Sequence, residues 1–381
     1  MPAARPYRTV VPQRDPKGRR EGVTTGACAA AAAKAATRVL VRGELLDVIE
    51  STLPNGQRRT FQLERCGRTG DVALSSIVKD GGDDPDCTHG AEIVAEVSLA
   101  DDPAIVLRGG EGVATVTKPG LGLDVGAPAI NPVPRRNITE MVREELEGSP
   151  RAGAVVTISV PGGEELARQT INARLGLLGG ISILGTTGVV KPYSTSAYKA
   201  SVVQAIDVAR ERGVTDVVLT TGGKSEAYAM RLYPEIPEEA FVQVGDFVGV
   251  AVKHCARRGT GSAIVVGMIG KLSKMADGRM MTHAAGSKVN MSLLGSIAEA
   301  LGAARDVVEA IRGANTARHV LELSAQAGIG ALADAICARA VDALARHAGL
   351  VAPLAVHAVL VDFDGSVLGR ASHDPLAPEI Q

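Results

Sequence analysis

The sequence has 381 residues, 45% hydrophobic and 22% charged, which is typical of a globular chain of about two domains, each of roughly 100 to 200 residues. Its 41 basic and 42 acidic side chains leave a net charge of −1, and it has five Tyr, four Phe and no Trp, so neither a broad basic field nor a base-stacking surface for nucleic acid is expected. No run approaches the roughly 18 to 20 apolar residues of a membrane span, no signal peptide is recognisable, and five scattered cysteines fit free thiols, so we expect a cytoplasmic protein with no membrane partner.

The first half of the chain predicts an α+β domain over residues 21–150, after a polar arm at residues 1–20. Thr24 and Thr25 precede an alanine-rich run that stops at Gly43, which predicts a helix capped by one of the two hydroxyls. Short β-branched runs then predict strands at 72–78, 91–99 and 105–107, and a further helix is predicted at 138–147. A strand at 154–160 could still belong to this domain.

The second half predicts an α/β domain over residues 151–370, followed by a flexible tail at 371–381. Apolar runs that end at glycine-bearing turns alternate with helical segments, an order typical of a mostly parallel sheet. The expected strands are 181–184, 216–220, 242–244 and 263–268, the clearest helices are 198–212 and 291–301, helix-rich sequence covers 304–347, and a last strand or hairpin covers 354–368.

Two loops that contain Thr-Thr-Gly follow predicted strands, and they are the candidate ligand loops. In a parallel sheet, ligands bind beyond the carboxyl ends of the strands, where glycines let the backbone approach them closely. A tight strand-to-helix turn is the alternative for each loop. The residues concerned are Gly185, Thr186, Thr187 and Gly188 in the first loop, and Thr221, Gly222 and Gly223 in the second.

Neither loop carries a phosphate-binding motif. A Walker loop needs a glycine where Val218 stands, and the first loop lacks the G-x-G-x-x-G of dinucleotide sites. An adenosyl ligand without a pyrophosphate fits better, with Glu226 and Asp246 placed for polar contacts to it. Several tyrosines follow the two loops, among them Tyr198, and could line a pocket for a flat ligand, although core packing is the default for each.

Three other segments carry charges that could bind ligands. The stretch 267–288 holds Lys271, Lys274 and His283 and is either a receiver for carboxylates and phosphates or a solvated helix. Arg135 and Arg136 follow a proline-rich loop and either bind anions or lie in a surface linker. Acids including Asp84 gather at residues 80–90, where a capped turn is favoured over a Mg²⁺ or Ca²⁺ site, since the calcium-loop spacing is not met.

Taken together, these motifs resemble the cobalt-precorrin-5B C(1)-methyltransferase family of anaerobic cobalamin biosynthesis. The segments that carry the resemblance are GVTTGACAAAAAK (22–34), GGDDPDCTHG (81–90), NPVPRRNI (131–138), PGGEEL (161–166), NARLGLLGGISILGTTG (172–188), GGKSE (222–226) and residues 267–283. Their number and order make the resemblance far more specific than any single glycine loop.

The resemblance implies methyl transfer from S-adenosylmethionine to ring carbon 1 of a cobalt-bound tetrapyrrole, with an α+β amino-terminal domain and a Rossmann-like carboxy-terminal domain. The cobalt would arrive within the substrate, so no protein metal site is expected. The acetate and propionate arms of the corrinoid give the basic residues a use. We therefore expect Thr24, Thr25, Arg135, Arg136, Lys271 and Lys274 to contact the substrate, and His283 or Asp84 to take up a proton.

Two alternatives stay open on the sequence. A tetrapyrrole carrier without catalytic activity would bind the corrinoid but not S-adenosylmethionine. A small-molecule kinase would bind ATP with Mg²⁺ and have no affinity for S-adenosylmethionine. The oligomeric state is not encoded in any motif, and a homo-oligomer is compatible with the sequence.

Overall fold

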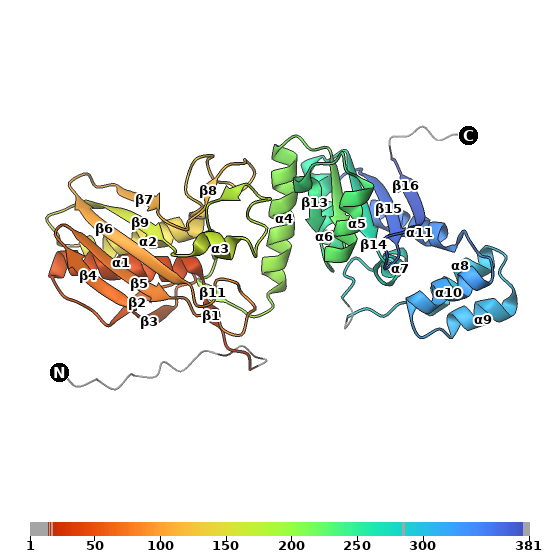
Figure 1. Cartoon of the computed structure of the whole chain (residues 1–381), viewed down its shortest axis with the longest axis horizontal. Helices are drawn as coiled ribbons and strands as arrows, with labels where there is room; N and C mark the ends of the chain where they lie inside the picture. The colour runs from red at the N-terminus through yellow and green to blue at the C-terminus, as the bar shows by residue number, and fades with distance from the viewer. Residues whose placement is uncertain (1–13, 15, 17, 284–285, 376–381) are drawn as a thin grey trace. The chain divides into compact units, whose positions relative to one another are not determined.

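The computed structural model describes residues 14, 16, 18–283 and 286–375, and its chain forms two compact units. The N-terminal unit ends at Ser194 and the C-terminal unit begins at Thr195. Both units mix helices with sheets (Figure 1). No described helix has the length and apolar character needed to cross a membrane.

The N-terminal unit is built on a five-stranded sheet of order β4-β5-β6-β9-β7, in which only β7 and β9 run parallel. Three two-stranded pairs, β2-β3, β1-β11 and β8-β10, complete its strands. The strands are β1 (Gly22–Val23), β2 (Val48–Thr52), β3 (Arg58–Gln62), β4 (Arg65–Thr69), β5 (Val72–Val78), β6 (Glu92–Ala100), β7 (Ile105–Gly109), β8 (Thr115–Val116), β9 (Gly153–Ser159), β10 (Leu177–Leu178) and β11 (Val189–Val190). The helices are α1 (Thr25–Arg42), α2 (Pro132–Leu146) and the short α3 (Gly163–Ala167).

Helix α1 is the central core element of this unit, as its alanine run predicts. The Thr24 hydroxyl accepts a hydrogen bond from the Ala27 amide at 3.2 Å, and Gly43 ends the helix in a left-handed conformation. The alanines are buried, and α1 packs against β5, β6 and α2 (Figure 1). Because alanine side chains are small, the helix lies close to its neighbours on every side.

An ion-pair network joins α1 to α2. Lys34 donates to Glu144 at 2.7 Å, and Arg38 Nε donates to Glu145 at 2.8 Å. Lys34 and Glu145 are both almost fully buried, so each charge depends on its partner to offset the loss of hydration. The network therefore holds α1 and α2 in a fixed packing arrangement.

The C-terminal unit is built on a sheet of order β13-β12-β14-β15-β16, in which the first four strands are parallel and β16 is an antiparallel edge strand. The strands are β12 (Asp216–Thr220), β13 (Phe241–Gln243), β14 (Ser262–Gly267), β15 (Ala355–Val361) and β16 (Val367–His373). The helices are α4 (Thr195–Glu211), α5 (Gly223–Leu232), α6 (Val248–Arg258), α7 (Ile269–Ala276), α8 (Met291–Ala300), α9 (Arg305–Arg312), α10 (Ala317–Gln326) and α11 (Leu332–Gly349), with a 3-10 turn at Glu238–Ala240.

Three predicted boundaries differ from the structure. The units divide at 194/195 and not at 150/151, because β9 pairs with β6 and β7 and so belongs to the first sheet. The run 181–184 is not a strand of the parallel sheet, since it makes only single bridges to Val113 and Ile130 within the N-terminal unit. The tail predicted from residue 371 begins inside β16, and most of the predicted arm lies outside the described residues.

Candidate functional site

In the C-terminal unit, the loops beyond the parallel strands gather polar side chains at one edge of the sheet. We call Thr221, Gly222, Glu226, Gln243, Asp246 and Lys271 the strand-edge cluster. Thr221 and Gly222 lie between β12 and α5, Asp246 follows β13, and Lys271 is on α7 after β14. The chain leaves β12 for β13 on one side and then returns to β14 on the other. This reversal is the topological switch point at which open parallel sheets bind ligands.

Hydrogen bonds order the acidic residues of the strand-edge cluster. Gln243 Nε2 donates to Glu226 Oε2 at 2.5 Å, and Lys271 forms an ion pair with Asp246. The Tyr198 hydroxyl donates to the Gln243 carbonyl at 3.2 Å. Burial and the nearby carboxylates of Asp246 and Glu226 raise the pKa of Tyr198. Two carboxylates and an aromatic ring therefore lie close together at the carboxyl edge of the sheet.

The backbone at the switch point leaves room for a ligand at one glycine and is tightly packed at another. A Cβ on Gly222 would meet no atom within 4 Å, whereas a Cβ on Gly267, at the end of β14, would lie 3.0 Å from the Thr221 side chain. Helix α5 begins at Gly223 with no side-chain cap, so its first amides can bind an acceptor group of a ligand. The predicted loop Thr221, Gly222 and Gly223 thus has open space beside its backbone at Gly222.

The basic residues predicted to receive substrate have partners within the chain. Lys271 is paired with Asp246, and Lys274 is buried and donates to the Thr282 carbonyl at 2.9 Å. Burial and the neighbouring Lys271 charge lower the pKa of Lys274. His283 is exposed, and its carbonyl accepts bonds from Gly286 and Ser287. The bond to Thr282 lets Lys274 hold the segment that follows α7, and the ion pair makes Lys271 a neighbour of the predicted donor residues.

The other Thr-Thr-Gly loop, 184–188, lies in the N-terminal unit and follows no strand of the parallel sheet. The Leu184 carbonyl accepts from the Gly26 amide and the Gly188 carbonyl accepts from the Thr24 amide, both at 3.0 Å. Gly185 has φ +128°, and a Cβ there would lie 2.5 Å from the Thr24 side chain. The structure therefore corrects the expectation that Gly185, Thr186, Thr187 and Gly188 follow a strand of the parallel sheet: this loop packs on the start of α1.

Beside this loop, the N-terminal unit contains a cavity of about 220 Å³, here called the N-terminal cavity. The predicted residues Thr24 and Thr25 line it. Its walls come from three segments that carry the family resemblance, 22–34, 81–90 and 172–188, and from residues within two positions of them. The lining residues are Thr24, Thr25, Lys79, Asp86, Cys87, Thr88, Thr170, Asn172, Ile181, Ser182, Leu184 and Val190.

A buried ion pair lies in the wall of the N-terminal cavity. Lys79 is 1% exposed, and its Nζ donates to Asp86 Oδ2 at 2.6 Å. Thr88 donates to Asp86 Oδ1 through its amide at 2.8 Å and its hydroxyl at 2.6 Å. Burial on its own would raise the pKa of Asp86, but the Lys79 ammonium and the bonds from Thr88 outweigh it and hold that pKa below its usual range.

The remaining predicted residues lie outside the N-terminal cavity. Asp84 accepts a hydrogen bond from the Tyr193 amide at 2.8 Å, which gives it a role in loop structure. Arg135 and Arg136 lie in the first turns of α2 and not in a linker, and Arg136 is 65% exposed with Glu140 at 4.0 Å. Within the described parts of the chain, no group of three or more His, Cys, Asp or Glu side chains could hold a metal ion.

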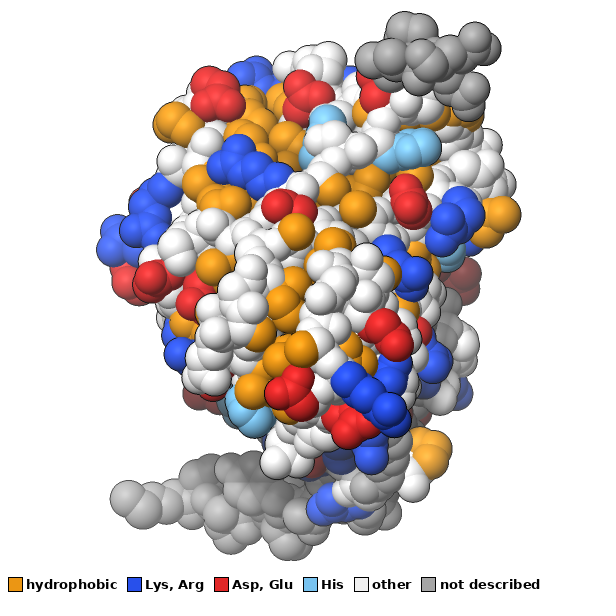
Figure 2. All heavy atoms as spheres, turned by 90° about the vertical axis from the view of Figure 1, so that its right-hand side faces the viewer, with side chains coloured by type: hydrophobic (Ala, Val, Ile, Leu, Met, Phe, Trp, Pro, Cys, Tyr) orange, Lys and Arg blue, Asp and Glu red, His pale blue; other side chains and the backbone are white. Residues whose placement is uncertain are grey.

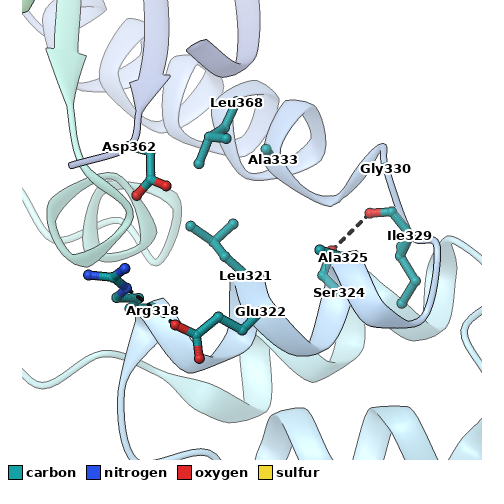
Figure 3. A pocket seen from close by; sticks show the side chains of 10 residues that line it. All are labelled: Arg318, Leu321, Glu322, Ser324, Ala325, Ile329, Gly330, Ala333, Asp362 and Leu368. Carbon is teal, nitrogen blue, oxygen red and sulfur yellow. Dashed lines mark hydrogen bonds and ion pairs between the residues drawn. The ribbon is translucent and has the colours of Figure 1, made fainter. Parts of the chain in front are cut away.

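A second hollow, of about 280 Å³, lies in the C-terminal unit between α10 and the β15-β16 hairpin (Figure 3). Arg318 donates to Glu322 at 3.2 Å and lies over the Phe363 ring, and Ser324 donates to the Ile329 carbonyl. Its other lining is mainly apolar. Figure 2 shows basic and acidic side chains in small mixed groups on the face of the molecule turned to the viewer, with no broad basic surface there.

The sequence reasoning missed several polar residues of the N-terminal cavity, above all Lys79 and Asp86. Lys79 directly follows β5 and precedes the segment 80–90, in which the acidic residues are the more prominent pattern. Thr170 and Asn172 reach the cavity from the turn that precedes β10. The sequence pattern that could have indicated Lys79 is a single lysine at the end of an apolar strand, next to the acidic segment 80–90.

Family models and relatives that match this sequence agree with the family resemblance of its motifs. The family model described as CbiD matches residues 12–192, and the model described as CbiD, C-terminal domain, matches residues 281–372. The cobalt-precorrin-5B C(1)-methyltransferase of Leptospira borgpetersenii serovar Hardjo-bovis (strain JB197) is 56% identical over 92% of this chain and 95% of the relative. The enzyme of the same name from Thermus thermophilus is 56% identical over 84% of this chain and 85% of the relative.

One solved structure, a cobalamin biosynthesis protein (cbiD) from Archaeoglobus fulgidus, is 29% identical, covers 69% of this chain and 82% of its own, and has a TM-score of 0.39. The family assignment rests on the sequence matches. One family model matches most of the N-terminal unit, the other matches residues 281–372 of the C-terminal unit, and relatives more than half identical extend over nearly the whole chain. The chain therefore belongs to the CbiD family of cobalt-precorrin-5B C(1)-methyltransferases.

Proposed function

We propose that this protein transfers a methyl group from S-adenosylmethionine to carbon 1 of cobalt-precorrin-5B, giving cobalt-precorrin-6A. The observation that carries the proposal is the 56% identity, over 92% of the chain, to a relative named for that reaction. The corrinoid is then the small-molecule partner, its cobalt belongs to the substrate, and the protein acts in the cytoplasm.

The strand-edge cluster is the proposed donor site, and the C-terminal unit is the proposed Rossmann-like domain. Support comes from the position of Thr221, Gly222 and Gly223 at the switch point and from the free space at Gly222. Glu226 and Asp246 offer carboxylates that can accept hydrogen bonds from ribose hydroxyls. The ring of Tyr198, 5.5 Å from that of Phe247, adds an aromatic surface for a flat ligand.

Transfer of a methyl group from a sulfonium to carbon is an in-line displacement. The electron pair of the ring carbon forms the new bond, and the sulfur leaves as a thioether, so no protein nucleophile is needed. The residues of this chain have to hold both reactants in line and keep water away. His283 and Asp84 stay our proposed proton acceptors, and Arg135, Arg136, Lys271 and Lys274 our proposed contacts to the corrinoid.

The test is methyl transfer measured directly. We expect purified protein, incubated without oxygen with cobalt-precorrin-5B and S-adenosylmethionine carrying a labelled methyl group, to give a labelled corrinoid and S-adenosylhomocysteine in equal amounts. Titration with S-adenosylhomocysteine should also stabilise the fold by mass action. Binding of the corrinoid with no affinity for S-adenosylhomocysteine would instead point to a carrier. Binding of ATP with Mg²⁺ in its place would point to a kinase.

A further inference from the structure

Lys79 has an unusual position for a charged residue, because it is among the largest fully buried side chains and also lines a cavity. An ammonium group has three N–H bonds to donate. Asp86 Oδ2, at 2.6 Å, is the acceptor for the Lys79 ammonium among the described residues. The other N–H bonds of Lys79 thus meet no acceptor in the described part of the chain, in a buried place where unmet polar groups are costly.

The surrounding wall is rich in hydrogen-bonding groups. The side chains of Thr24, Thr88, Thr170 and Asn172 line the same space. Lys79 is the basic residue of this wall, and the carboxylate of Asp86 is already engaged by Lys79 and Thr88. A ligand group that complements such a wall needs oxygen acceptors, and a carboxylate is the acceptor with which an ammonium forms its strongest hydrogen bonds.

The size of the cavity limits what can enter it. At about 220 Å³ it is smaller than the roughly 300 to 1,000 Å³ of sites that enclose drug-sized ligands. A tetrapyrrole ring cannot fit, but a single acetate or propionate arm can. The amino-acid end of the methyl donor carries a carboxylate of similar size.

We propose that the N-terminal cavity is a carboxylate-binding site in which Lys79 receives one carboxylate of a reactant. This inference rests on the proposed function, because that function supplies ligands with carboxylates. Asp86 is the positioning residue of the site, since it holds the Lys79 ammonium at the cavity wall while Thr88 holds Asp86. The source of the carboxylate is either a peripheral arm of the corrinoid or the amino-acid end of the donor, and the second source would place the donor in this cavity instead of at the strand-edge cluster.

The test needs a variant that removes the charge of Lys79 without leaving the carboxylate of Asp86 unpaired. Lys79→Met keeps an unbranched side chain that is one atom shorter and uncharged. Lys79→Met combined with Asp86→Asn removes both charges while the asparagine can still accept from Thr88. The double variant is expected to fold even where the single variant does not, because it buries no isolated charge. Lys34→Met is the matched control, since Lys34 is a buried, ion-paired lysine of the same unit that does not line the cavity.

Four probes separate the two sources by isothermal titration. Cobyrinic acid has free peripheral carboxylates, and its fully methyl-esterified form has none. S-Adenosylhomocysteine has the amino-acid end, and 5′-methylthioadenosine lacks it. If a corrinoid arm enters the cavity, we expect the double variant to bind cobyrinic acid at least tenfold more weakly while its affinity for the ester is unchanged. If the donor enters the cavity, we expect the double variant to bind S-adenosylhomocysteine at least tenfold more weakly while its affinity for 5′-methylthioadenosine is unchanged.

Either result supports the carboxylate site, and Lys34→Met should leave all four affinities unchanged. Equal affinities of the wild type and the double variant for all four probes would overturn the inference while leaving the proposed function intact. An equal loss for the acid and the ester, or for both adenosyl probes, would also overturn it, because recognition would then not depend on a carboxylate. A wild-type protein that binds none of the four would contradict the proposed function together with the inference.

Discussion

Two loops of this chain share the sequence Thr-Thr-Gly, at 186–188 and 220–222, and the structure uses them in different ways. The first packs on the start of α1, with Gly185 pressed against Thr24. The second lies at the switch point of the parallel sheet, where a side chain on Gly222 would meet no atom within 4 Å. A glycine that is needed for packing and a glycine that leaves space for a ligand look alike in sequence.

The lysine–carboxylate pairs near the two loops differ in a similar way. Lys79 and Asp86 form a pair whose lysine is fully buried, whereas the side chains of Lys271 and Asp246 are 30% and 23% exposed. Burial decides how much each pair matters to the fold, because a buried charge that loses its partner is strongly destabilising and an exposed one is not. The following predictions test these contrasts.

The largest expected effect is on stability at the first loop. Gly185→Ala places a Cβ 2.5 Å from Thr24 at φ +128°, and the combined strain and overpacking should lower the free energy of unfolding by about 3 kcal/mol. Gly222→Ala, at an extended backbone position with free space, should change stability little and weaken S-adenosylhomocysteine binding. Thermal unfolding and titration of both variants test this. Equal stability losses would remove the distinction between the loops.

The next effect separates the two lysines of α7. Lys274→Met removes a buried donor and leaves the Thr282 carbonyl without it, which should cost about 2 kcal/mol of stability. Lys271→Met removes a partly exposed charge and should cost less than about 1 kcal/mol, but it frees Asp246 and should change donor affinity. Chemical denaturation measures the stability of the two variants, and titration with S-adenosylhomocysteine measures their donor affinity. A larger loss of stability for Lys271→Met would contradict the role given to Lys274.

A smaller effect concerns the donor carboxylates. Glu226→Gln removes the charge and keeps the shape, so we expect about a tenfold loss of S-adenosylhomocysteine affinity, equivalent to ~1.4 kcal/mol, with a modest change in stability. The control is Glu309→Gln, an exposed glutamate of α9 in the same unit. Unchanged donor affinity in Glu226→Gln would move the donor site away from the strand-edge cluster.

The smallest effect is a pH dependence at the N-terminal cavity. The pKa of Asp86 is lowered in the folded protein, so the unfolded chain binds the proton more readily, and Asp86 stabilises the fold above its ordinary pKa of about 4. This stabilisation is lost as the pH falls below about 4 toward the lowered value. Lys79→Met combined with Asp86→Asn, which leaves no buried charge unpaired, should therefore flatten the loss of melting temperature between pH 5 and pH 2. Asp71→Asn, at an exposed turn, should not.

The sequence predicted most elements because their patterns are local. The cap at Thr24 and the stop at Gly43 defined α1, and β-branched runs located β5 and β12 within their observed bounds. The run 181–184 misled us because a short apolar segment before a glycine turn looks the same in either unit. Its bridging partners, Val113 and Ile130, are distant in sequence and lie outside the named strands, and no local pattern encodes that pairing.

The candidate sites were also predicted only in part, because local patterns do not show which distant segments come together. Thr221 follows β12 and Asp246 follows β13. Because the carboxyl ends of parallel strands meet at one edge of a sheet, their loops are expected to lie close together. The N-terminal cavity is assembled from segments as far apart as Thr24, Lys79 and Asn172, and no such rule applies to its mixed sheet. The importance of Lys79 depends on its burial, which only the folded chain reveals.

The order of strands in the C-terminal unit also has a consequence for synthesis on the ribosome. Strand β14 pairs with β15, and Ser262 lies opposite Ala355, so helices α7 to α11 of the described chain are made between the two partners. Until the last part of the chain has been translated, one edge of β14 has unpaired amides and carbonyls, which is a template for association with other chains. We expect nascent or truncated chains that end before β15 to depend on chaperones, whereas the N-terminal sheet has all its strands before translation reaches α4.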